Sequence, residues 1–105
     1  MDPSAAATNG GPLNRKVVLT NPSGFHLRPM QAFVELATKY QCAIRVRRDA
    51  LDPVDGKSIW ALMSLIAEKG TELVVEVDGP DGPDALEKLV DLLTNLETRM
   101  NLGED

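Results

Sequence analysis

Three stretches of the chain place apolar residues three and four positions apart, the spacing that gathers them on one face of a helix. The first stretch begins after Pro29 and contains Met30, Phe33, Val34, Ala37 and Tyr40. The second is a short apolar segment at 59–67, preceded by Ser58 and followed by Gly70, residue types that favour the start and the end of a helix. The third follows a turn at 81–84 and contains Leu86, Leu89, Val90, Leu93 and Leu96.

Four other stretches have the composition or the alternation of strands. Residues 16–20 form a short β-rich run, and residues 73–77 form the strongest such run in the chain. Residues 42–47 alternate between apolar and polar side chains, as a strand buried on one face does. A weaker extended piece at 51–54 leads into a turn at 55–56.

The order of these elements is β-α-β-β-α-β-α, in which each of two helices connects two strands. This order predicts an α+β fold, an open-faced β-sandwich with a four-stranded antiparallel sheet and three helices on one of its faces. We expect a flexible tail at 1–14, one domain at 15–97 and a polar C-terminal exit at 98–105.

Composition and charge exclude several classes of protein. A chain of 105 residues, 43% of them hydrophobic, suits one packed domain, and a net charge of −5 argues against nucleic acid as the main partner. Cys42 is the only cysteine, so no internal disulfide can form. No apolar run approaches the roughly 18 residues of a membrane span, and the N-terminus lacks the features of a signal peptide. We therefore expect a cytoplasmic protein without membrane insertion.

His26, the only histidine, lies where the first predicted strand has turned into the first predicted helix. The free N–H groups and the positive dipole end of a helix start favour a bound anion. Gly24 allows a tight turn, Pro29 fixes φ in the first helical turn, and Arg28 adds a permanent cation. A neutral imidazole has a free lone pair, so His26 is suited to carry a phosphoryl group, whose charge Arg28 would stabilise.

Plainer interpretations of His26 remain open on this evidence. A single histidine near a helix start is more often a capping or packing residue than a nucleophile. Metal binding and hydrolase chemistry are weaker interpretations, because the chain has no second histidine, no cysteine cluster and no suitably spaced pair of carboxylates. We expect no metal and no cofactor in this chain.

The segment around His26 resembles the active-site motif of HPr, the small phosphocarrier of the phosphoenolpyruvate-dependent sugar phosphotransferase system. That motif usually reads Gly-(Ile/Leu)-His-Ala-Arg-Pro-Ala, and here it reads Gly24-Phe25-His26-Leu27-Arg28-Pro29. A second block resembles the regulatory-serine helix of that family: Lys57-Ser58-Ile59-Trp60-Ala61-Leu62-Met63-Ser64-Leu65. The resemblance covers residues 16–96 with a matching order of elements, and it implies the HPr-like fold.

The resemblance implies roles for residues and partners. His26 would be phosphorylated on Nδ1, Arg28 would neutralise the phosphoryl group, and Ser23 and Gly24 would form the supporting loop. The donor would resemble Enzyme I, which phosphoenolpyruvate charges, and the acceptor would resemble a IIA domain. The chain would then be a phosphoryl carrier rather than a turnover enzyme, and we expect it to be a monomer.

The resemblance also implies that Ser58 is the target of an ATP-dependent HPr kinase/phosphorylase. On pattern alone Ser58 is a helix N-cap, a role that is compatible with regulation. A helix start stabilises a phosphate, so inhibition would come from blocked docking and from added negative charge.

The chain departs from the family pattern by carrying larger apolar residues near His26. Leu27 and Met30 replace alanines, and Trp60 stands where a methionine or an aliphatic residue is usual. Such residues pack in a core or form an exposed surface that docks partner proteins. The docking hypothesis comprises Phe25, Leu27, Ile59, Trp60 and Met63.

Three other functions remain as alternatives. The first is a mainly regulatory HPr-like module, read by the kinase and by transcriptional partners in a cell with an incomplete sugar transport system. The presence of His26 and Arg28 argues against a purely regulatory role, and the Ser58 block argues against a carrier of a nitrogen phosphorelay. An unrelated ferredoxin-like ligand-sensing domain would show no phosphorylation.

Overall fold

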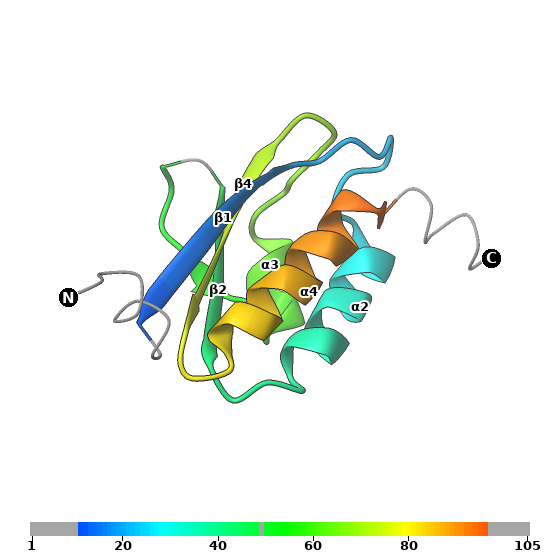
Figure 1. The fold of residues 1–105 in the computed structure, drawn as a ribbon. Coiled ribbons are helices and arrows are strands. Elements are labelled where there is room, and N and C mark those ends of the chain that lie inside the picture. The colour runs from blue at the N-terminus through cyan, green and yellow to red at the C-terminus, as the bar shows by residue number, and fades with distance from the viewer. Residues whose placement is uncertain (1–10, 49, 97–105) are drawn as a thin grey trace.

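The computed structural model describes residues 11–48 and 50–96, which form a layer of strands and a layer of helices (Figure 1). Within this part of the chain the sheet has the order β1-β4-β2-β3, and every pairing is antiparallel. Its strands are β1 (Pro12–Val18), β2 (Ala43–Arg48), β3 (Val54–Asp55) and β4 (Glu72–Asp78). The helices α2 (Leu27–Ala37), α3 (Ile59–Met63) and α4 (Gly82–Thr94) lie on one face of the sheet. The predicted α+β open-faced β-sandwich, with the order βαββαβα, is confirmed.

The core fills the space between the two layers. Alternate residues of β4 face the helices, and Leu73, Val75 and Val77 are buried there. Phe33 of α2 and Leu89 of α4 are fully buried in the same cluster. Because burying a side chain of this size contributes about 1.5–3 kcal/mol, this core fixes both helices on the sheet.

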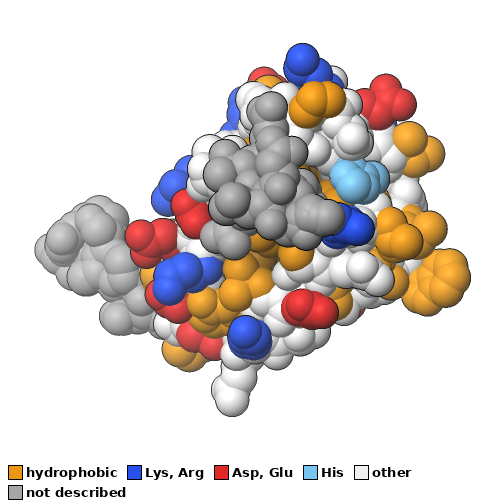
Figure 2. All heavy atoms as spheres, turned by 90° about the vertical axis from the view of Figure 1, so that its right-hand side faces the viewer, with side chains coloured by type: hydrophobic (Ala, Val, Ile, Leu, Met, Phe, Trp, Pro, Cys, Tyr) orange, Lys and Arg blue, Asp and Glu red, His pale blue; other side chains and the backbone are white. Residues whose placement is uncertain are grey.

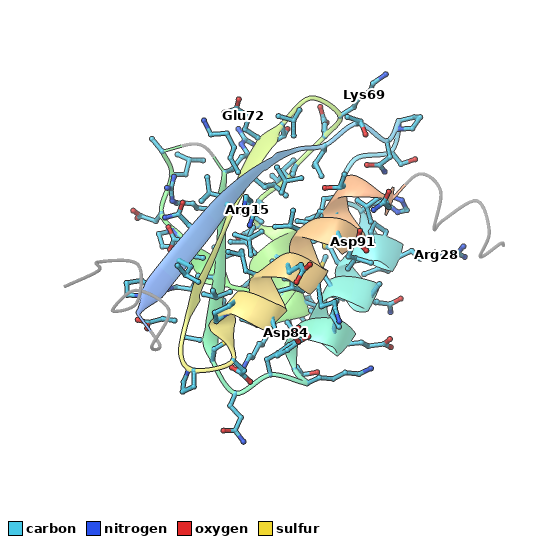
Figure 3. The ribbon with its side chains drawn as sticks, viewed as in Figure 1. Arg15, Arg28, Lys69, Glu72, Asp84 and Asp91 are labelled. Carbon is cyan, nitrogen blue, oxygen red and sulfur yellow. The ribbon has the colours of Figure 1, made fainter. Side chains whose placement is uncertain are left out.

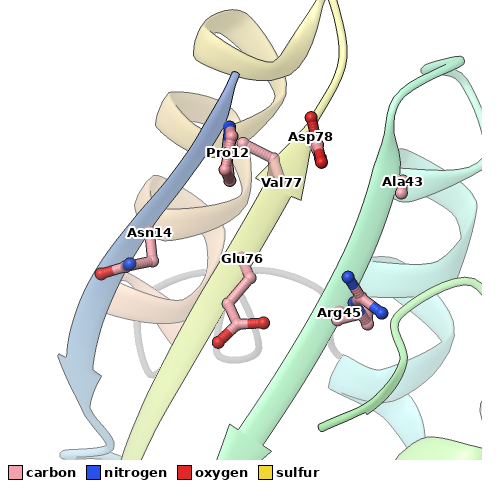
Figure 4. A pocket seen from close by; sticks show the side chains of 7 residues that line it. All are labelled: Pro12, Asn14, Ala43, Arg45, Glu76, Val77 and Asp78. Atoms are coloured by element: carbon pink, nitrogen blue, oxygen red, sulfur yellow. The ribbon is translucent and has the colours of Figure 1, made fainter. Parts of the chain in front are cut away.

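The other face of the sheet is polar. Ion pairs link β4 to its two neighbours, Lys16 to Glu72 at 3.7 Å and Arg47 to Glu76 at 2.8 Å. A pocket opens on this face (Figure 4), and it is lined by Pro12, Asn14, Ala43, Arg45, Glu76, Val77 and Asp78. It lies on the side of the sheet away from the helices and therefore away from the turn that precedes α2.

The strand β1 begins at Pro12, three positions before the predicted start of the domain at Arg15. Leu13 is partly buried and packs against the core, which draws this segment onto the sheet. A proline is tolerated at the first position of an edge strand, because its missing N–H costs no ladder hydrogen bond there. Residues 12–14 of the predicted tail at 1–14 belong to this strand, whereas residues 1–10 of that tail and the predicted exit at 98–105 lie outside the described residues.

The helix α3 ends at Met63, whereas the apolar pattern predicts a helix as far as Ala67. The Ser64 hydroxyl donates to the carbonyl of Ala61 at 2.6 Å, a local bond that competes with the helical pattern. Beyond it, the Arg48 guanidinium donates to the carbonyls of Leu65 and Ile66. These contacts come from a distant strand, so the spacing of apolar residues alone cannot reveal them.

Hydrogen bonds join the turn after α2 to the start of α4. The carboxylate of Asp81 accepts hydrogen bonds from the amides of Gln41 at 2.8 Å and Cys42 at 2.9 Å, and the bond from Gln41 is the largest cause that lowers the pKa of Asp81. The Tyr40 hydroxyl donates to Asp84 at 2.7 Å, which raises the pKa of Tyr40 to about 12. Burial raises the pKa of the Cys42 thiol to about 11. These contacts hold the helix whose other end carries His26.

Candidate functional site

His26 is the N-cap residue of α2, and its side chain is exposed. Its backbone is extended (φ −98°, ψ −169°), and its carbonyl accepts a hydrogen bond from the amide of Met30 at 3.0 Å. Its side chain makes no capping hydrogen bond with the described part of the helix. The ring therefore neither caps α2 nor packs in the core, which removes both plain interpretations of this histidine.

Arg28 lies in the first turn of α2, where its exposed side chain projects from the helix (Figure 3). The next residue, Pro29, is fully buried and lacks the N–H that the first helical turn does not need. The first turn of a helix leaves N–H groups without intrahelical acceptors, and its dipole end is positive. Arg28 and the helix start therefore place positive charge on the same side of the molecule as the His26 ring.

The turn before His26 is held by its own hydrogen bonds. Gly24 has φ +64°, and its amide donates to the carbonyl of Asn21 at 3.0 Å. In return, the Asn21 side chain donates from Nδ2 to the carbonyl of Gly24 at 2.8 Å. Asn21 is only 5% exposed, so this side chain is a structural part of the turn. Residues 21–24 have the composition of a turn, but nothing in this local pattern reveals that the Asn21 side chain is buried.

A second segment of the chain closes the turn from the other side. The amide of Phe25 donates to the carbonyl of Ala67 at 2.9 Å. A Cβ atom at Gly24 would lie 2.6 Å from the same carbonyl oxygen. Glycine is therefore required at position 24 both by its backbone conformation and by this close approach. Ser23, the other predicted member of the supporting loop, lies exposed in the turn.

We define the apolar patch as the four exposed apolar residues of α2, α3 and the segment that follows α3: Leu27, Trp60, Met63 and Ile66. Their exposed fractions are 54%, 79%, 45% and 68%, and Figure 2 shows hydrophobic side chains beside the pale-blue histidine. Of the predicted docking residues, Leu27, Trp60 and Met63 are therefore exposed, and Ile59 is half-buried. Core packing is the wrong interpretation for Leu27 and Trp60.

Phe25 is the predicted docking residue that the structure contradicts. It is only 2% exposed, and its ring meets that of Phe33 edge to face, with the ring centroids 5.8 Å apart. A side chain in this position cannot contact a partner. Phe25 instead anchors the turn in the core, so that the next residue, His26, faces outward.

Ser58 is the N-cap of α3, and its hydroxyl accepts a hydrogen bond from the amide of Ala61 at 3.2 Å. It is half-buried, in a groove between α2 and α3 that Gln31, Val34, Glu35, Lys57, Ser58, Ile59 and Trp60 line. Trp60 thus belongs both to this groove and to the apolar patch, which joins the surroundings of Ser58 to those of His26.

Residues 11–48 and 50–96 contain neither a metal-binding cluster nor a membrane-spanning helix. No three His, Cys, Asp or Glu side chains in these residues are grouped so that they could hold a metal ion. No helix in the same residues is long and apolar enough to cross a membrane.

The fold and the site define a small α+β domain that presents one exposed histidine at the start of a helix, next to an arginine. The family model described as "PTS HPr component phosphorylation site" matches residues 13–95. Phosphocarrier protein HPr of Pseudomonas aeruginosa is 41% identical over 89 residues, which cover 85% of this chain and 96% of that protein. HPr-like protein Crh of Bacillus subtilis is 35% identical over 77 residues, 73% of this chain and 89% of its own length.

Solved structures agree with the sequence comparison. The crystal structure of HPr-C-His from Thermoanaerobacter tengcongensis has a TM-score of 0.76 and 31% identity, and the match covers 82% of this chain and 96% of that one. The chain therefore belongs to the HPr family of phosphocarrier proteins. This assignment confirms the resemblance and gives the chain a general role as a phosphocarrier of the phosphotransferase system.

Proposed function

We propose that the chain accepts a phosphoryl group from phosphorylated Enzyme I on Nδ1 of His26 and passes it to a IIA-type acceptor. The observation that carries the proposal is the exposed His26 ring at the start of α2, which caps nothing in the described helix. The Nδ1 lone pair attacks phosphorus, and the bond from phosphorus to the donor breaks as the N–P bond forms. The next acceptor takes the group by the same displacement, so the carrier returns unchanged.

The residues around His26 have separate roles in this proposal. Arg28 pairs with the oxygens of the phosphoryl group, and the first turn of α2 adds its positive dipole end. Ser23 and Gly24 form the supporting loop, and the apolar patch contacts both donor and acceptor. The carrier works in the cytoplasm. It works as a monomer, because each transfer requires that the surface around His26 be accessible to one partner protein at a time.

The direct test is phosphorylation by Enzyme I and phosphoenolpyruvate, followed by intact-mass measurement. The wild-type protein should gain one acid-labile phosphoryl group, and His26→Ala should gain none. Phosphate that survives acid, or that remains in His26→Ala, would show that another residue carries it. An added IIA domain should discharge the wild-type adduct.

A regulatory role is the second candidate, supported by the groove position of Ser58 and by the similarity to a protein named HPr-like protein Crh. In this role HPr kinase/phosphorylase phosphorylates Ser58 with ATP, and transcriptional partners bind the product. Incubation with that kinase and ATP should add an acid-stable phosphate that Ser58→Ala lacks. If Ser58 is modified and His26 accepts nothing from Enzyme I, the regulatory role is the principal one.

A further inference from the structure

Ile66 has an unusual backbone conformation for a β-branched residue. Its φ is +49°, in the left-handed region, and it is the only residue other than glycine with positive φ among the described residues. For a residue with a Cβ this conformation costs roughly 1–2 kcal/mol of conformational free energy, a cost that glycine does not have. Such strain persists only where surrounding contacts determine the backbone.

Arg48 supplies those contacts. It is the last residue of β2, and its Nη1 donates to the carbonyls of Leu65 at 3.0 Å and Ile66 at 3.1 Å. The backbone of Arg48 lies in the sheet, in register with Leu73 of β4. The segment after α3 is thus attached to a rigid strand on both sides of the strained residue.

The next carbonyl along this segment bonds the residue that precedes His26. Ala67 follows Ile66, and its carbonyl accepts the hydrogen bond from the amide of Phe25 at 2.9 Å. Of three consecutive carbonyls, the first two bind Arg48 and the third binds the residue before His26. A rotation of the backbone at Ile66 would therefore change the direction of the Ala67 carbonyl.

We infer that Arg48 is a positioning residue for phosphoryl transfer, because it holds Ile66 in its strained conformation and the Ala67 carbonyl against the Phe25 amide. The inference rests on the proposed role of His26. Arg48 acts through the backbone from 65 to 67 and does not pair with the phosphoryl group. It thereby differs from Arg28, which lies in the same helical turn as the site.

The first test compares Arg48→Ala with Arg45→Ala, which removes an exposed arginine from the same strand. In Arg48→Ala the amide of Phe25 should exchange its hydrogen about tenfold faster, measured against the amide of Val75 in the core, because a bond to a charged donor has been lost. Phosphoryl acceptance at saturating Enzyme I should slow by about tenfold, with the half-saturating concentration unchanged. Arg45→Ala should leave both values as in the wild type.

A glycine at position 66 separates positioning from general stability. Glycine adopts positive φ without strain, so in an Ile66→Gly background Arg48→Ala should slow the reaction less than about threefold. The comparison is between two proteins that share the change at 66, which removes any effect of that side chain on docking. If Arg48→Ala is poorly folded, Arg48→Met gives the same comparison, since methionine keeps an apolar stem but has no N–H to donate to the two carbonyls.

Three results would overturn the inference. The first is an unchanged rate of hydrogen exchange at the Phe25 amide in Arg48→Ala, and the second is an unchanged rate of phosphoryl acceptance in that variant. The third is an equal loss of this rate on Arg48→Ala whether position 66 is isoleucine or glycine. If the wild-type protein accepts no phosphoryl group, the proposed function fails. The hydrogen-exchange measurement still decides whether Arg48 holds the turn.

Discussion

The exposed imidazole of His26 depends on the residues before and after it. Phe25 points into the core and Pro29 is buried, whereas the ring between them is exposed. The extended backbone of an N-cap position allows this arrangement, because the helix uses the carbonyl of His26 and leaves its side chain free. The proposed nucleophile, His26, and the anchor, Phe25, are thus adjacent residues with opposite environments.

Replacing Arg28 should slow phosphoryl transfer without changing the fold. Arg28→Ala removes a charge-assisted contact worth about 1.5–3 kcal/mol, which corresponds to a slowing of roughly tenfold to a hundredfold. Arg28→Lys should restore part of the rate, because lysine keeps the charge but not the planar fork. Rapid-quench measurement of the phosphorylated protein checks both, and equal rates for all three proteins would contradict the assigned role.

Replacing Gly24 by alanine should destabilise the protein by about 2–4 kcal/mol, since it combines a strained φ with a clash at the Ala67 carbonyl. Gly70→Ala is the matched control. Gly70 also has positive φ, at +89°, but a Cβ there would meet no atom within 4 Å. Urea unfolding should show the smaller loss for Gly70→Ala, and equal losses would mean that the close approach at Gly24 has no cost.

Residue-scale prediction from sequence succeeded where a motif identifies the position and failed where a contact comes from elsewhere in the chain. The motif identified His26, whose ring is exposed and makes no capping hydrogen bond to α2, while its role as phosphoryl carrier stays a prediction. The burial of Phe25 was missed, because a large apolar residue beside a site fits a surface or a core equally well. The strained Ile66 was also missed, since isoleucine is among the residues least suited to positive φ.

At the scale of elements, Ser58 combines an observed helix cap with a proposed regulatory role. Ser58→Ala removes the hydrogen bond to the Ala61 amide and should destabilise the protein by about 0.5–2 kcal/mol. Ser58→Asp keeps a capping acceptor, so it should remain near wild-type stability yet accept phosphoryl groups from Enzyme I more slowly. Thermal melts and transfer assays on both variants separate the two roles. A normal transfer rate in Ser58→Asp would argue against regulation by charge at this position.

The contact between α4 and the turn after α2 should give the protein an acid-sensitive component of stability. The pKa of Asp81 is lowered in the folded state, mainly by the hydrogen bond from Gln41. A lowered folded pKa means that this stabilisation is present above the ordinary aspartate pKa of about 3.9 and is lost as the pH falls through the folded value. Asp81→Asn should therefore be less stable than wild type near neutral pH, and the difference should shrink in acid.

Urea unfolding over a series of pH values checks this behaviour, with Asp52→Asn as the control. Asp52 is an exposed aspartate in the connection between β2 and β3, so its replacement controls for the loss of one surface carboxylate. If the free energy of unfolding differed by the same amount between wild type and Asp81→Asn at every pH, the charge of the Asp81 carboxylate would not be what stabilises the contact between α4 and the turn after α2.

At the scale of the whole molecule, the order and type of the elements followed from hydrophobic spacing, β-rich composition and turn residues, because the sheet and the helices each bury one face. The contacts that the turn before His26 makes with distant segments could not be predicted in this way. The turn is completed by the carbonyl of Ala67, which lies far away in sequence, and Arg48 at the end of another strand bonds the two carbonyls that precede it. Periodicity within an element carries no information about such contacts.

The chain also divides its surface into faces of different character, and this division predicts the effect of Trp60 on partner binding. The outer face of the sheet carries cross-strand ion pairs, whereas the exposed apolar side chains beside the histidine lie on the helical side. Trp60 is 79% exposed, so Trp60→Ala should change the free energy of unfolding by less than about 0.5 kcal/mol. An exposed tryptophan beside a reactive group is suited to anchor a partner.

We therefore expect Trp60→Ala to raise the half-saturating concentration of Enzyme I by roughly tenfold or more while the maximal transfer rate stays near that of the wild type. Leu51→Ala is the matched control, because Leu51 is 57% exposed and belongs to the connection between β2 and β3, on the far side of the sheet from α2 in Figure 1. Steady-state transfer assays over a range of Enzyme I concentrations measure both quantities. A lowered maximal rate with unchanged half-saturation would place Trp60 in the transfer step, and equal effects of the two variants would remove the apolar patch from the docking surface. Trp60 belongs both to the apolar patch and to the groove at Ser58. A docking role for Trp60 would therefore also explain how a phosphate on Ser58 could slow phosphoryl transfer to His26, which lies on another helix.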